Sequence, residues 1–159
     1  MSFIADKLYA KSNPIETLKE HTDQLIENYH LLRRNYPHIL SQRLWDLLWL
    51  AVLYHDTGKV YPVFQNVIRK KLGLPLLPTI HQEQIPHNYL SVLFVPLNEI
   101  QREKNLTREE EKVLLQAIAY HHERKKDVQS LKGDIIQVIE QGLNQWIPML
   151  EREMGIPIA

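Results

Sequence analysis

The stretch Leu50-Ala51-Val52-Leu53-Tyr54-His55-Asp56-Thr57-Gly58-Lys59 decides how the rest of the chain is interpreted. An apolar run ends abruptly in a histidine and an aspartate, followed shortly by a glycine and a lysine. Imidazole and carboxylate groups can both bind a divalent cation, and Gly58 permits a turn that a residue with a Cβ would resist. The stretch therefore predicts a buried helix with two kinds of metal ligand at its C-terminal end.

The segments around this stretch carry helical patterns. A first helix is expected to begin at Asn13-Pro14-Ile15-Glu16, with Asn13 as the N-cap, Pro14 as the first helical residue and Glu16 completing a capping box. Its apolar stripe includes His21, and it is expected to end at residues 35–37. Ser41 can cap the next helix, which is apolar on almost all sides and should be central.

Later helices have equally clear boundaries. One is expected from Pro62 to Gly73, with Phe64, Val67 and Ile68 inward, and another from His87 to Pro96. A third is expected to begin at the capping box of Thr107 and Glu110 and to continue through Val113 and Ala117 to His122. The last is expected to end near Gly155, with a bend at Pro148. No strand-length alternation and no repeat stand out. The sequence therefore predicts an all-α domain, a bundle of about six helices over residues 1–159.

Composition narrows the choice of partners and compartment. The 19 basic and 19 acidic side chains give a formal net charge of zero, so a polyanion must be bound by local charge. The chain has no cysteine, which excludes disulfides and thiolate metal sites. The N-terminus lacks a signal-peptide pattern, and no apolar run approaches the roughly 18 residues of a membrane span. We expect a cytoplasmic protein with no membrane partner.

Further histidines can converge on His55 and Asp56. His21 lies on the inner face of the first helix, His87 opens a later helix, and His121-His122 ends another. Several imidazoles with one carboxylate suit Mn, Fe, Ni, Co or Zn better than Ca. One aspartate can bridge two cations roughly 3.5–4 Å apart, which together activate water and stabilise the leaving oxygen of a phosphate ester. The remaining histidines, His30, His38 and His81, are expected at the surface or in loops.

The set of motifs resembles the HD metal-dependent phosphohydrolases, and more narrowly the HD nuclease domain of the CRISPR type I interference helicase-nuclease. The resemblance rests on Glu20-His21-Thr22, His55-Asp56-Thr57-Gly58-Lys59, the subfamily marker Phe64-Gln65, Pro86-His87-Asn88 with Ser91, and Tyr120-His121-His122. These motifs span residues 20–122. The type III CRISPR HD domain would share the His-Asp and His-His motifs, but Phe64-Gln65 argues against it.

This resemblance implies a role for each matching residue. His21, His55 and Asp56 would bind one metal ion, and Asp56 would bridge to a second ion completed by His87, His121 and His122. Lys59 would lie near the scissile phosphate as an electrostatic aid, beside the catalytic Asp56. The resemblance implies two divalent transition metal ions (Mn, Ni, Co or Fe, with Mg as an alternative) and cleavage of single-stranded DNA in CRISPR interference.

The resemblance also implies a helicase partner and leaves one ligand without a match. The chain has no Gly-x-x-x-x-Gly-Lys-Ser/Thr loop, so unwinding requires a helicase in trans or in a missing C-terminal segment, and through it the target-bound RNA-guided complex. The family's late acidic ligand has no good counterpart. Asp134 is a possible metal ligand, Asp127 is the other late aspartate, and a ligand beyond Ala159 would mean that a C-terminal part is lacking.

Two basic clusters, Arg69-Lys70-Lys71 and Arg124-Lys125-Lys126, are weak candidates for a DNA backbone track, and solvated helix faces are the simpler interpretation. Trp45, Trp49 and Trp146 are expected in the core. Two alternatives to a nuclease stay open. One is an HD nucleotide phosphohydrolase for dNTPs or cyclic nucleotides, and the other is a catalytically impaired HD module that only binds a partner.

Overall fold

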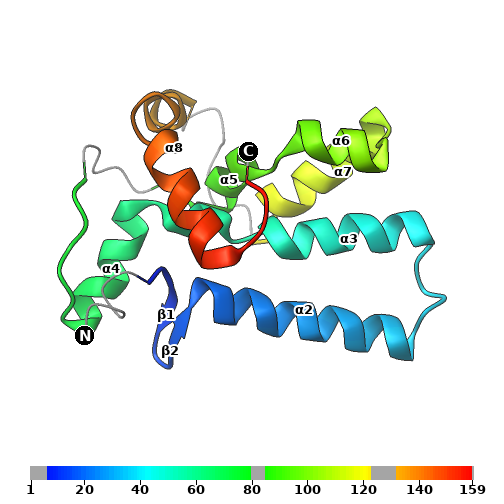
Figure 1. Cartoon of the computed structure of the whole chain (residues 1–159), viewed down its shortest axis with the longest axis horizontal. Coiled ribbons are helices and arrows are strands. Elements are labelled where there is room, and N and C mark those ends of the chain that lie inside the picture. The colour runs from blue at the N-terminus through cyan, green and yellow to red at the C-terminus, as the bar shows by residue number, and fades with distance from the viewer. Residues whose placement is uncertain (1–6, 80–84, 123–131, 159) are drawn as a thin grey trace.

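The computed structural model describes residues 7–79, 85–122 and 132–158 and confirms the predicted all-α character (Figure 1). A small two-stranded sheet accompanies the helices. In chain order the elements are β1 (Tyr9–Ser12), β2 (Ile15–Thr17), α2 (Leu18–Asn35), α3 (Gln42–Tyr54), the 3₁₀ helix η1 (Thr57–Val60), α4 (Pro62–Leu72), α5 (His87–Ser91), the 3₁₀ helix η2 (Val92–Phe94), α6 (Leu97–Lys104), α7 (Arg108–Ala119) and α8 (Lys132–Met154).

The start of the first helix corrects the sequence prediction. Residues 13–16 do not begin a helix, because they form the turn and second strand of the antiparallel β1–β2 hairpin. Thr17 is the N-cap instead: its hydroxyl accepts from the Glu20 N–H, and the Glu20 carboxylate accepts from the Thr17 N–H. Helix α2 therefore begins four residues later than Pro14, with a complete capping box.

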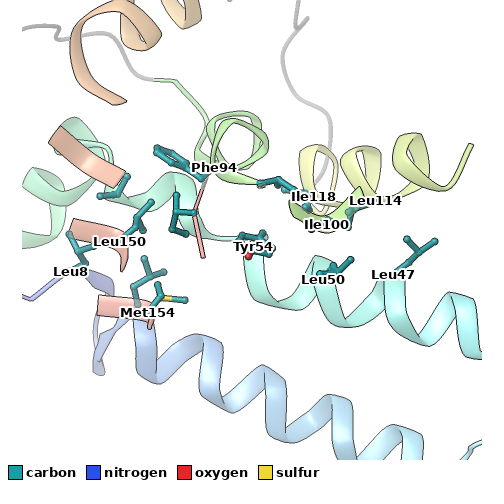
Figure 2. Packing of buried hydrophobic residues seen from close by; sticks show 14 of the residues in the cluster. Leu8, Leu47, Leu50, Tyr54, Phe94, Ile100, Leu114, Ile118, Leu150 and Met154 are labelled. Atoms are coloured by element: carbon teal, nitrogen blue, oxygen red, sulfur yellow. The ribbon is translucent and has the colours of Figure 1, made fainter. Parts of the chain in front are cut away.

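Helices α2 and α3 lie side by side and run in opposite directions, joined at the far right of Figure 1. Ser41 caps α3 as predicted, accepting a hydrogen bond from the Leu44 N–H. The buried face of α3 contributes to the main hydrophobic core together with α6, α7, α8 and the segment before β1. Figure 2 shows this packing and labels Leu8, Leu47, Leu50, Tyr54, Phe94, Ile100, Leu114, Ile118, Leu150 and Met154.

Some later helix boundaries agree with their sequence signals and others do not. The helix predicted from His87 to Pro96 is divided into α5 and η2, α6 was not predicted, and α7 ends at Ala119 instead of His122. Pro62 is the first residue of α4, and Gly73 ends it with a φ of 70° that suits glycine. Thr107 and Glu110 form the predicted capping box of α7. Of the residues predicted to face inward on α4, Ile68 is buried and Phe64 is partly buried, but Val67 is exposed.

The aromatic residues lie where the sequence placed them. Trp45 is buried, and Trp49 and Trp146 pack, partly buried, against the core. His30 and His38 are exposed, while His81 lies outside the described residues. Within the described ranges, no helix is long and apolar enough to cross a membrane.

Candidate metal centre

Asp56 lies at the centre of a group of imidazoles, at the junction of α3 and η1. Its Oδ2 atom is 3.1 Å from the His21 Nε2 and 3.2 Å from the His55 Nε2. Its Oδ1 atom is 3.1 Å from the His87 Nε2 and 3.2 Å from the His121 Nε2. The Asp56 side chain is 3% exposed. One buried carboxylate thus presents each of its oxygens to a different pair of imidazoles.

The fifth imidazole, His122, approaches this centre from outside. Its Nε2 lies 3.1 Å from the His87 Nε2. Ligand atoms of Asp56, His87, His121 and His122 all lie within 4.8 Å of one another, and the same holds for His21, His55 and Asp56. The structure therefore brings together all six residues predicted as metal ligands, in the two groups that the resemblance implied.

Backbone carbonyl groups hold two of these histidines, His55 and His121, with Nε2 directed at Asp56. The His55 Nδ1 lies 2.7 Å from the Val52 carbonyl oxygen, and the His121 Nδ1 lies 2.6 Å from the Ile118 carbonyl oxygen. A carbonyl oxygen can only accept, so Nδ1 carries the proton in both rings. In the neutral imidazole this leaves the lone pair on Nε2, which is the arrangement of a metal-binding histidine.

Two atoms at the centre have no hydrogen bond, although they are buried. They are the Asp56 Oδ1 and the His121 Nε2, which face each other at 3.2 Å without hydrogen-bond geometry. Buried polar atoms are normally paired, and two electron-pair donors directed at one point are satisfied by a cation between them. The chemistry of the donor set therefore fits a divalent transition metal.

The pKa values of the site follow from this crowding. Burial alone would raise the pKa of Asp56, but the His121, His21, His55 and His87 imidazoles outweigh it and hold the pKa well below its usual range. Burial lowers the pKa of His87, and burial with the neighbouring imidazoles lowers that of His122. The hydrogen bond to Asp56 raises the pKa of His21 against the effect of burial.

Gly58 and Ser91 position His87 against this centre. The Gly58 N–H donates to the Ser91 Oγ at 2.8 Å, and the same hydroxyl donates to the His87 carbonyl oxygen at 2.8 Å. A Cβ on Gly58 would collide with that carbonyl and with Ser91. The sequence argument assigned Gly58 to a turn, but its φ is not positive. The glycine is required because α5 approaches the backbone closely.

The lysine of the predicted motif lies inside the site. Lys59 is largely buried, with its Nζ 3.1 Å from the Asp56 Oδ2 and 5.6 Å from the centre of the Phe64 ring. Phe64 also contacts the His87 ring, at 5.5 Å between centroids. Gln65 is fully buried and donates to the Lys59 carbonyl oxygen at 2.6 Å. Phe64 therefore contacts both His87 and Lys59, while Gln65 holds the backbone of Lys59.

The other candidate residues are less closely tied to the centre. Asp134 lies in α8, but the structure does not describe its side chain. Asp127 and Arg124-Lys125-Lys126 lie outside the described residues. Arg69 is 3% exposed and donates to the Pro75 carbonyl oxygen at 2.6 Å. This geometry contradicts a place for Arg69 in a DNA backbone track, because the guanidinium is used inside the protein. Lys70 and Lys71 are exposed.

Sequence reasoning missed one contact at the centre. The Glu16 Oε1 lies 2.6 Å from the His21 Nδ1, on the side of the ring away from Asp56. The signal was present in the sequence, because Thr17-x-x-Glu20 is a capping box that makes Glu16 the residue before the N-cap. The competing assignment of Asn13 as N-cap hid this relationship.

A comparison with protein families agrees with this geometry. The family model described as "Cas3, HD domain" matches residues 9–152. The chain belongs to the Cas3 HD-domain family. Membership implies a metal-dependent hydrolase of the HD type that works with a helicase and nucleic acid in the CRISPR system. The Cas3 HD-domain match includes every histidine around Asp56.

Two further comparisons add no relative to this Cas3 HD-domain assignment. Neither a search of curated proteins nor a search of solved structures gives a match to the chain. Within the family, the roles of individual residues therefore rest on the geometry around Asp56.

Proposed function

We propose that this chain is a nuclease that hydrolyses phosphodiester bonds of single-stranded DNA in CRISPR interference, using two divalent transition metal ions. The observation that supports it best is the Asp56 carboxylate, whose two oxygens face separate groups of imidazoles. A bridging carboxylate between two cations is typical of sites that cleave phosphate esters. Membership in the Cas3 HD-domain family supports the same chemistry.

Each group of side chains has a role in this proposal. His21, His55 and Asp56 would hold one ion, and His87, His121 and His122, again with Asp56, would hold the other. When bound, the ions supply Lewis acidity that activates water and stabilises the leaving oxygen. Lys59 places its positive charge beside the centre, where it can stabilise charge on the scissile phosphate.

The partners follow from the family and from the surface. DNA cleavage in this setting needs a helicase that supplies the single strand, together with the target-bound RNA-guided complex. Exposed Lys70 and Lys71, at the C-terminal end of α4, are the candidates for phosphate contacts within the described part of the chain.

The test is cleavage of a circular single-stranded DNA, which has no ends and therefore reports endonuclease action. With Mn²⁺ or Ni²⁺ we expect the wild-type protein to linearise and then degrade the circle on a denaturing gel, and EDTA to stop it. Asp56→Ala should be inactive. Asp46→Ala, on the same helix α3 and outside the metal centre, should cleave like the wild type. Equal cleavage by wild type and Asp56→Ala would refute the proposal.

Parallel measurements distinguish the alternatives. Hydrolysis of dNTPs or cyclic nucleotides without cleavage of the circle would favour a nucleotide phosphohydrolase. Two transition metal ions per chain would support the active form, whereas one or none, together with intact DNA, would favour the impaired binding module.

A further inference from the structure

We propose that Glu16 is a positioning residue of the metal centre: its carboxylate holds the His21 ring so that Nε2 faces Asp56. The inference rests on the metal site of the proposed function and adds a residue to it. The two nitrogens of His21 are used at opposite sides of the ring. Nδ1 is 2.6 Å from the Glu16 Oε1, and Nε2 is 3.1 Å from the Asp56 Oδ2.

The backbone places Glu16 in position for this contact. The capping box makes Thr17 the N-cap of α2, so Glu16 occupies the N′ position and His21 the N4 position. In many helices apolar residues at N′ and N4 pack together and fix the direction of the chain before the helix. Here the same two positions hold a carboxylate and an imidazole, so the helix start itself directs Glu16 to His21.

The β1–β2 hairpin that carries Glu16 is fixed to the site. The Gln65 side chain accepts from the Tyr9 N–H and donates to the Tyr9 carbonyl oxygen, both at 2.9 Å, and donates to the Lys59 carbonyl oxygen. One buried amide thus joins β1 to η1, where Lys59 contacts Asp56. The Leu18 N–H also donates to the Leu8 carbonyl oxygen at 2.8 Å. The hairpin that carries Glu16 is therefore fixed both to η1, through Gln65, and to the start of α2, through Leu18.

Glu16 orients the His21 ring in the same way that backbone carbonyl oxygens orient the rings of His55 and His121. The Nδ1 atoms of His55 and His121 contact the carbonyl oxygens of Val52 and Ile118, which no substitution removes. His21 contacts a side chain instead. A carboxylate that accepts from the Nδ1–H of a metal-binding histidine fixes the proton position and the ring orientation, and makes Nε2 more basic. Glu16 is the orienting group that mutation can test.

The experiment is calorimetric titration of the metal-free protein with Mn²⁺, without DNA. We expect Glu16→Ala to weaken binding of the ion held by His21 by about 10–100-fold. Glu16→Gln keeps an oxygen that can accept from Nδ1 and should lose much less affinity. Glu27→Ala removes an exposed glutamate from α2, the helix that carries His21, and should bind Mn²⁺ like the wild type. Thermal melting in EDTA checks that all variants are folded.

A second readout separates positioning from a general structural effect. In the Glu16→Ala variant the Mn²⁺ concentration for half-maximal DNA cleavage should rise, while the rate at saturating Mn²⁺ recovers. Weaker Mn²⁺ binding by Glu16→Ala, with partial rescue by Glu16→Gln, supports the positioning role of Glu16. A wild type that binds Mn²⁺ but leaves DNA intact would refute only the proposed nuclease activity. Equal Mn²⁺ affinity of wild type and Glu16→Ala overturns the positioning role, as does a wild type that binds no Mn²⁺.

Discussion

Gly58 and Ser91, 33 positions apart in the chain, share a hydrogen bond of 2.8 Å that leaves no room for a side chain between η1 and α5. A methyl group on Gly58 must displace the His87 carbonyl, because that atom occupies the space of the Cβ. We therefore predict that Gly58→Ala lowers the free energy of unfolding by about 1–3 kcal/mol and weakens Mn²⁺ binding at His87.

The matched control for this change is Gly73→Ala. Gly73 has a positive φ of 70° and open space around its Cβ position, so alanine there strains the backbone by about 1–2 kcal/mol without touching the site. Urea unfolding and Mn²⁺ titration should separate the two variants. Loss of stability in both with unchanged Mn²⁺ affinity for Gly58→Ala would contradict the positioning of His87 by this contact.

Metal binding should stabilise the fold through Asp56. A ligand at 100 times its Kd stabilises the folded state by about 2.7 kcal/mol, and for a chain of this size that corresponds to a rise in Tm of about 5–10 °C. We expect Mn²⁺ to produce this shift in the wild type and EDTA to reverse it. Asp56→Asn should abolish the shift and Asp46→Asn should keep it, as measured by differential scanning fluorimetry. A similar shift in Asp56→Asn would show that Mn²⁺ binds elsewhere.

The Gln65 side chain should contribute strongly to stability. Gln65→Leu removes three hydrogen bonds of the Gln65 amide, one from the Tyr9 N–H and two to the carbonyl oxygens of Tyr9 and Lys59, and a hydrogen bond contributes about 0.5–1.5 kcal/mol. We expect a loss of at least about 2 kcal/mol in urea unfolding and weaker Mn²⁺ binding, because the hairpin carrying Glu16 loses its link to η1.

Asn66 offers a close comparison for Gln65. Its side chain forms the same kind of paired contact with the backbone of Leu77, at 2.9 Å and 2.7 Å, in a segment away from the metal centre. Asn66→Ala should lower stability but leave Mn²⁺ affinity unchanged. If both variants changed Mn²⁺ affinity equally, Gln65 would have no specific connection to the site.

Acid should weaken the start of α7 in a defined pH range. Hydrogen bonds from Arg43, and from the backbone of Thr107, lower the pKa of Glu110 from 4.5 to about 2. Because the folded value is below the unfolded one, the ionised carboxylate stabilises the fold above about pH 4.5, and this contribution is lost as the pH falls toward 2. We expect Glu110→Gln to have a lower Tm than the wild type at neutral pH and an equal Tm near pH 2.

Glutamine at position 110 can still complete the capping box, so the comparison isolates the charge that pairs with Arg43. The exposed Glu109, in the same helical turn, provides the control. Glu109→Gln should show no such convergence with falling pH. A Tm difference for Glu110→Gln that stays constant from pH 7 to pH 2 would contradict the assignment.

The candidate metal ligands could be predicted from the sequence because they lie at positions that helical patterns define. His55 and His87 follow or open a helix, His121 and His122 come after the end of α7, and His21 lies in the first turns of α2. Helix boundaries carry local signals, such as the Ser41 cap, and a bundle can bring such ends together. Local sequence signals are therefore sufficient to predict the set of candidate ligands.

The hairpin could not be predicted, because its strands are only four and three residues long and such segments show no reliable alternation. Two consecutive patterns also competed for the helix start, Asn13-x-x-Glu16 and Thr17-x-x-Glu20. Contacts far apart in the chain, such as Gln65 with Tyr9, favour the hairpin. The role of Gly58 was misjudged for a similar reason: the close approach of Ser91 depends on tertiary structure.

The carbonyl oxygens of Val52 and Ile118 have a consequence for how this centre tolerates genetic change. Any residue that preserves the helix at position 52 or 118 presents the same backbone carbonyl to His55 or His121. Substitutions at these two positions therefore leave the orientation of the two histidine rings unchanged. His21 depends on the side chain at position 16. A library that randomises all three positions should therefore retain metal-binding clones with many residues at 52 and 118 but few at 16.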